Sequence, residues 1–258
     1  MMVNKTSKAA TNELVIKAKF FAFVSLIAFL PLPVRALTLI ENRNALLSND
    51  QIEWSSLGKL LNPFAPNFED FLPNTFSAQS SNGLGLTVEI PSADGDITAP
   101  FVFQNNPPVQ TNFGAGDFLL FTGFSPTVIP TGNSNPITIV FNEKIKAVGT
   151  QIAASGSENI DYEIFLSVFD EANNLLGTFS LPGISSGNRD NSAVFLGVKS
   201  DTVNIKSVVI RTSSPERGLG INTVSIVTVN EPYSGLSLLI IGSVVLSFKS
   251  YQFKKCKK

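Results

Sequence analysis

Residues 162–169 read Tyr-Glu-Ile-Phe-Leu-Ser-Val-Phe, and this stretch decides the fold class. Its side chains alternate between two faces, and one face carries Tyr162, Ile164, Leu166 and Val168. A period of two is typical of a β-strand with one buried face. Asn173-Asn174 follows, and asparagine tolerates the left-handed backbone of a tight turn. We therefore predict a hairpin whose second strand is Leu175–Leu181.

The same signature recurs on both sides of this hairpin, as short apolar runs separated by Gly, Pro, Asn, Asp and Ser. Further strands are predicted at 84–90, 118–121, 137–141, 148–153, 193–198, 203–210 and 221–229. One short helix is expected at Ile40–Leu47. No run within this region sustains helical periodicity, and the turn spacing is typical of a sandwich or jelly roll. The predicted fold class is all-β.

The N-terminus has the three parts of a secretory signal peptide. A lysine-bearing stretch precedes the apolar run Phe20–Leu30, and Pro31 ends that run. Ala36 is the small residue that a signal peptidase prefers, so cleavage is predicted between Ala36 and Leu37. The apolar run is shorter than the roughly twenty residues that span a bilayer. The alternative is a buried core helix.

The C-terminus predicts a short membrane-inserting helix. Pro232 ends the last predicted strand, and Gly235–Phe248 carries no charge. Five lysines follow between Lys249 and Lys258, which indicates that this end stays in the cytoplasm. The alternative is a final core strand with a basic tail. The chain thus divides into a signal peptide (1–36), a secreted domain (37–229) and a tail (230–258).

This order of parts resembles the PEP-CTERM proteins of Gram-negative bacteria, including cyanobacteria. The matching tail consists of Asn230-Glu231-Pro232, then Leu236–Phe248, then the lysine cluster. Asn230 stands where the family motif has its first proline. The resemblance implies that an exosortase-type membrane peptidase reads Glu231 and Pro232. It also implies export across the inner membrane, transient anchoring, and a final place at the cell surface or outside the cell.

The body also resembles a domain often found in front of such tails. The similar segments are 52–58, 112–122, 137–141, 148–152, 193–201 and 220–224. They cover most of residues 50–229. The resemblance implies a secreted β-sandwich and no particular activity.

Composition excludes several function classes. The chain has no histidine, and its single cysteine is Cys256, so the domain has no histidine-based triad, thiol nucleophile or disulfide. The chain has 19 basic and 20 acidic residues, and residues 1–36 and 230–258 each contain five of the basic and one of the acidic ones. The body, residues 37–229, therefore has nine basic and eighteen acidic residues. An acidic body does not favour nucleic acid.

The chemistry that remains is that of carboxylates and loop oxygens. Neighbouring acids are available to a glycan hydrolase or lyase, although solvated loop acids are the default interpretation; these are Glu69-Asp70, Asp94 with Asp96, Asp161 with Glu163, and Asp170-Glu171. The loops 94–96 and 188–191 are oxygen-rich, as a structural calcium requires, with plain Asx-turns as the alternative. Trp54 is either a platform for sugar rings or a core residue.

The favoured interpretation is a non-enzymatic surface or extracellular-matrix protein, with the membrane, an exosortase-type peptidase and polysaccharide as partners and no cofactor. The alternative is a secreted carboxylate-based glycan hydrolase or lyase.

Overall fold

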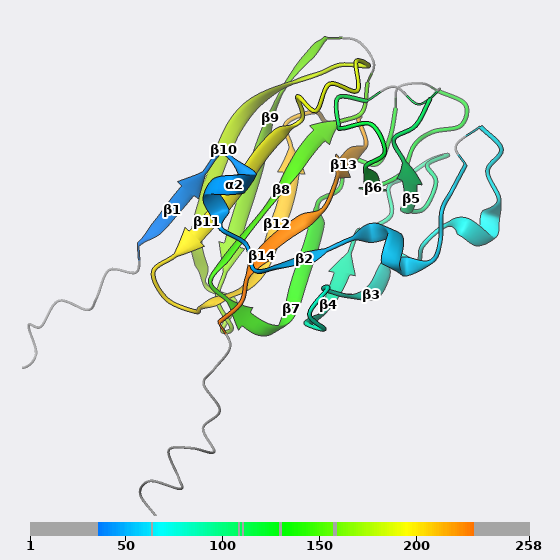
Figure 1. Ribbon diagram of the computed structural model, residues 1–258. Coiled ribbons are helices and arrows are strands. Elements are labelled where there is room, and N and C mark those ends of the chain that lie inside the picture. Colours follow the sequence, from blue (N-terminus) through cyan, green and yellow to red (C-terminus); the bar gives the residue numbers. More distant parts are fainter. Residues whose placement is uncertain are drawn as a thin grey trace, which may run out of the picture. The chain divides into compact units, whose positions relative to one another are not determined.

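The computed structural model describes residues 36–62, 64–107, 109, 111–128, 131–156 and 159–229. Contacts divide the chain into residues 1–36 and 37–258, and the second unit contains nearly all described residues. It is built from two antiparallel sheets, as the all-β prediction required (Figure 1). The predicted signal peptide and the tail, with Glu231 and Pro232, lie outside the described residues, apart from Ala36 at the boundary.

The first sheet has eight strands, in the order β1-β11-β8-β13-β6-β5, with β14 paired to β8 and β2. Their bounds are β1 (Leu37–Ile40), β2 (Asp50–Ile52), β5 (Phe101–Gln104), β6 (Phe118–Phe121), β8 (Ala147–Ala154), β11 (Val194–Ser200), β13 (Leu219–Ile221) and β14 (Val224–Val227). The second sheet has six strands, in the order β10-β9-β12-β7-β4-β3. Their bounds are β3 (Thr75–Gln79), β4 (Gly85–Glu89), β7 (Ile137–Ile145), β9 (Ile160–Phe169), β10 (Leu175–Ser185) and β12 (Ile205–Thr212). The short helices are α2 (Arg43–Leu46), η1 (Trp54–Leu57) and η2 (Phe68–Asp70).

The predicted hairpin is confirmed as β9 and β10. Tyr162, Ile164, Leu166 and Val168 are buried, as their alternation indicates. Asn173 has a φ of 62°, the left-handed conformation that the turn requires. The Asp170 carboxylate accepts hydrogen bonds from the backbone N–H of Ala172 and Asn174. Asp170 is therefore a turn residue.

Several predicted elements are wrong in their bounds. β7 continues past Phe141 to Ile145, and β10 continues past Leu181 to Ser185. The helix expected over residues 40–47 covers only Arg43–Leu46, because Ile40 still pairs with Gly197 in the sheet. The strand predicted at 221–229 is two short strands, β13 and β14. They are separated at Asn222, whose buried side chain hydrogen-bonds to Gln151 in β8.

The core lies between the two sheets, and β8 is buried along its whole length because both of its faces are covered. On its outer face Ala147 packs with Leu46 and Phe195 in a small second cluster. Gly149 leaves room for Phe195, because a Cβ at this position would lie 2.6 Å from the ring. Helix α2 is therefore fixed against the outside of the first sheet.

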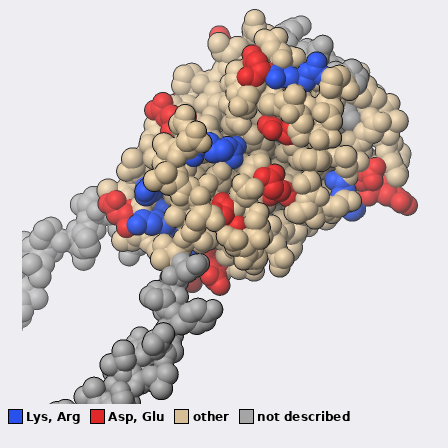
Figure 2. Space-filling model, viewed as in Figure 1, with Lys and Arg blue, Asp and Glu red and all other residues tan. Residues whose placement is uncertain are grey.

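Charged side chains are scattered over the face seen in Figure 2, and neither sign gathers in a patch there. Within the described ranges, no helix has both the length and the apolar character needed to cross a bilayer.

Candidate functional site

A groove of ≈ 440 Å³ lies beside β5, and we call it the aromatic groove. It is lined by Leu60, Leu61, Asn62, Phe64, Gln104, Asn106, Pro107 and Val109. The backbone N–H of Leu61 donates to the carbonyl oxygen of Val102 at 2.8 Å, which attaches this wall to the edge of β5. Leu61 is buried, while its neighbour Leu60 stays 48% exposed. The wall is thus held in place with part of its apolar surface facing solvent.

Phe64 is the prominent aromatic side chain of this groove, and 63% of it is exposed. The Asn62 side-chain oxygen accepts from the backbone N–H of Phe64 at 3.0 Å, which fixes the turn that presents the ring. The Asn106 amide donates to Gln104 Oε1 at 2.7 Å, and Gln104 Nε2 donates to the carbonyl oxygen of Gly116 at 3.1 Å. Two positioned amides therefore share the groove with an exposed ring.

This combination suits a ligand with both apolar and hydroxyl surfaces. An aromatic ring buries apolar C–H surface, and a side-chain amide both donates and accepts hydrogen bonds. Binding pockets generally combine apolar lining with a few placed polar groups of this kind. None of the described residues that line the groove is charged. Its chemistry therefore favours a neutral polyhydroxylated ligand.

A second aromatic side chain is exposed nearby in sequence. Phe68 in η2 is 89% exposed, and its ring centroid lies 6.2 Å from that of Phe71. Phe71 in turn contacts Phe101, at 5.9 Å between centroids. Lys59 Nζ donates to the carbonyl oxygens of Glu69 and Phe71, which closes the loop. Phe68 does not line the aromatic groove.

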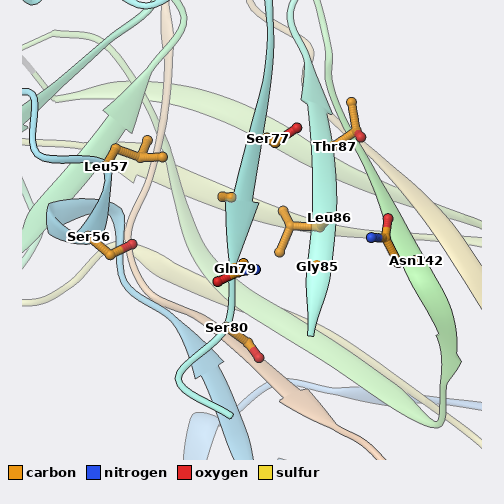
Figure 3. A pocket seen from close by; sticks show the side chains of 10 residues that line it. Ser56, Leu57, Ser77, Gln79, Ser80, Gly85, Leu86, Thr87 and Asn142 are labelled. Carbon is orange, nitrogen blue, oxygen red and sulfur yellow. The ribbon is translucent and has the colours of Figure 1, made fainter. Parts of the chain in front are cut away.

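A second groove, of ≈ 650 Å³, runs along β3, and we call it the polar groove (Figure 3). It is lined by Ser56, Leu57, Ser77, Ala78, Gln79, Ser80, Gly85, Leu86, Thr87 and Asn142. None of these residues is charged. A Cβ at Gly85 would meet the side-chain amide of Asn142, so the glycine lets this amide lie close to β4. Gln79 pairs with Gly85 across β3 and β4, so two amides flank the glycine.

The predicted acid pairs do not converge on either groove. Glu69 and Asp70 belong to η2, and Asp96 accepts a hydrogen bond from Thr127 Oγ1 at 3.2 Å. Glu171 forms a salt bridge with Lys144 at 3.1 Å between Nζ and Oε2. Among the residues that the structure describes, no acidic side chain lines either groove. Asp161 lines a third hollow, of ≈ 590 Å³, together with Asn188 and Asp190.

Of the two loops considered for calcium, residues 188–191 contain a turn. Asp190 accepts a hydrogen bond from the backbone N–H of Ser192 at 3.1 Å, and its hydrogen bonds with Ser192 lower the pKa of the Asp190 carboxyl. Among the described residues, no three His, Cys, Asp or Glu side chains are grouped so that they could hold a metal ion. The structure thus supplies no cluster that supports the calcium hypothesis.

Trp54 is a core residue and not a platform. It is fully buried, and its indole N–H donates to the carbonyl oxygen of Asn222 at 2.9 Å. Sequence reasoning missed the exposed rings of Phe64 and Phe68. Their signal lies in residues 62–68, Asn-Pro-Phe-Ala-Pro-Asn-Phe, where apolar rings occur among turn residues without alternation.

No protein-family model matches the sequence, and no curated protein matches it. Among solved structures, a carbohydrate-binding module of Clostridium stercorarium in complex with cellobiose is 13% identical, with a TM-score of 0.26, over 52% of this chain and 89% of that one. A DUF4465 family protein of Bacteroides caccae is 12% identical, with a TM-score of 0.26, over 71% and 98% of the two chains. A family 22 carbohydrate-binding module of Clostridium thermocellum Xyn10B is 10% identical, with a TM-score of 0.21, over 74% and 100%. Similarities this low establish neither a family nor a ligand.

Proposed function

We propose that this chain is an exported, non-enzymatic protein of the cell surface or extracellular matrix whose sandwich binds a polysaccharide. The observation that carries the proposal is the aromatic groove, where the exposed ring of Phe64 lies with the amides of Gln104 and Asn106. Other large apolar side chains are also exposed, but Phe64 and Leu60 are exposed together in a groove that two placed amides also line, and this grouping supports an interaction site. The absence of charge among the groove's lining residues favours a neutral polysaccharide.

Affinity electrophoresis in native gels tests this function. Gels containing hydroxyethylcellulose, xylan or galactomannan should slow the protein, and gels containing an acidic polysaccharide should not. Phe64→Ala should weaken binding by about tenfold, which corresponds to about 1.4 kcal/mol. Phe68→Ala is the matched control, because Phe68 is exposed but lies outside the groove lining. Unchanged retardation of Phe64→Ala, or equal losses in both variants, would contradict the proposal.

Export and sorting are part of the same proposal. The mature chain should begin at Leu37, and N-terminal sequencing of exported protein checks this. If Glu231 and Pro232 are read by an exosortase-type peptidase, replacing both with alanine should trap a long form in the inner membrane. Release of the alanine variant at the rate of the natural chain would remove the sorting role and leave a simple anchor.

A further inference from the structure

The free edge of β3 presents backbone groups that the domain does not use. Hydrogen bonds from Ile90 N to Asn74 O and from Ser80 N to Leu84 O, at 2.8 and 2.9 Å, fix the phase of the β3–β4 ladder. In an antiparallel pair, residues that exchange both backbone bonds alternate with residues that exchange none. Phe76 and Ala78 therefore bond to β4, while Thr75, Ser77 and Gln79 direct their N–H and C=O groups away from it.

These outward groups have no backbone partner in the described part of the chain. Natural edge strands are usually protected by charge, proline, a bulge or a covering segment. Residues 75–79 are Thr-Phe-Ser-Ala-Gln and pair with β4 in continuous register. β3 therefore has no charged residue, no proline and no bulge. By contrast, β10 at the opposite edge contains Pro182 and a register irregularity. The edge of β5 accepts the N–H of Leu61.

The polar groove gives this open edge two different sides. Leu86 points toward the side on which Leu57 lies, while Ser77 and Thr87 point the other way (Figure 3). The side-chain polar atoms of Ser77, Thr87 and Asn142 make no hydrogen bond within the described ranges. An extended segment with alternating apolar and polar side chains matches both sides at once.

We propose that this segment is β3 of a second copy, paired antiparallel about a two-fold axis at Ser77. The pairing is self-complementary, as a two-fold interface requires. Thr75 lies opposite Gln79 of the partner on the polar side. On the apolar side Phe76 lies opposite the partner's Ala78, a large side chain against a small one. No like charges meet, because β3 carries no charge.

Disulfide trapping tests the axis directly. The full-length chain is purified in detergent with Cys256→Ser, which removes its only cysteine. Directly opposite residues of a hydrogen-bonded antiparallel pair have Cα atoms about 5.5 Å apart, within the range that a disulfide spans. Ser77→Cys should therefore form a covalent dimer on mild oxidation. Thr87→Cys is the matched control, because it lies on the same face one strand away from the edge and its two copies are too far apart.

Sedimentation of the same full-length chain gives an independent readout. Ser77→Pro removes an N–H that points away from β4, so it should abolish the dimer and leave the unfolding temperature nearly unchanged. Ala78→Pro breaks the β3–β4 ladder and should unfold the edge. The proposal is overturned if the natural chain is monomeric at all concentrations. It is equally overturned if Ser77→Pro still dimerises, or if Thr87→Cys crosslinks as readily as Ser77→Cys.

Discussion

Tyr162 offers the sharpest test of the core, because its hydroxyl titrates and its surroundings are buried. The ring is only 4% exposed, and the hydroxyl donates to the carbonyl oxygen of Ile152 at 3.2 Å. Burial raises the pKa of Tyr162 from 10.0 to about 12. The fold therefore holds the neutral phenol, and its stabilisation is present below pH 10 and lost as the pH rises through about 12.

The magnitudes follow from these two pKa values. At neutral pH, Tyr162→Phe loses one hydrogen bond and should cost about 1 kcal/mol of unfolding free energy. One pKa unit corresponds to about 1.4 kcal/mol, so ionisation should remove about 2 kcal/mol from the natural protein by pH 12. The phenylalanine variant has no such loss. The two stability curves should cross at about pH 11, where the loss from ionisation in the natural protein equals the cost of the missing hydrogen bond in the variant.

The 37–229 fragment is the right material, because Tyr162 is its only tyrosine. Urea unfolding across the alkaline range measures both stability curves, and the near-ultraviolet absorbance of tyrosinate measures the pKa of Tyr162. Lysine and arginine ionisation affects both proteins alike and cancels in the difference. A Tyr162 pKa near 10 in the folded fragment, or parallel curves that never cross, would refute the reasoning.

Three further substitutions probe the fold, each measured by urea unfolding of the same fragment. Gly183→Ala should cost about 1–3 kcal/mol, because its Cβ would lie 2.5 Å from the buried Tyr162 ring. Trp54→Phe should cost about 2 kcal/mol or more, because it removes both buried volume and the hydrogen bond to Asn222. Asn173→Ala should cost about 1 kcal/mol at its left-handed φ of 62°, whereas Asn173→Gly should be neutral.

The sequence predicts those strands whose pattern is local. β6 matches the predicted bounds, and β9 lies within two residues of its alternating run, because one buried face imposes a period of two. β3 was missed, because its only apolar residues are Phe76 and Ala78. The sheet order is also beyond local reasoning: β12 pairs with both β7 and β9. Such pairings join segments far apart in the chain, and no window of residues records them.

The residues of the candidate site could not be predicted from the sequence. The absence of histidine and of a cysteine in the domain favours loop acids and Trp54 as candidates, and none of them lines the aromatic groove. Which aromatic side chain is exposed depends on tertiary packing, and a sequence pattern does not show it. Trp54 is enclosed beside Asn222, while Phe64 stays in solvent on a wall attached to β5 through Leu61. A single sequence gives both rings the same apolar character.

The two grooves are bordered by neighbouring residues of the chain, and the two proposals can be combined. Ser56 and Leu57 border the polar groove, and Leu60, Leu61, Asn62 and Phe64 border the aromatic groove. A dimer paired through β3 would carry two aromatic grooves, and a polysaccharide repeats its sugars along the chain. Once one groove has bound the polysaccharide, the second groove meets the same chain at a high effective concentration. Ser77→Pro should therefore weaken binding to long polysaccharides by about 100-fold while leaving the affinity for short oligosaccharides unchanged. Calorimetry with matched long and short ligands measures the difference, and an equal effect on both lengths would show that the grooves act independently.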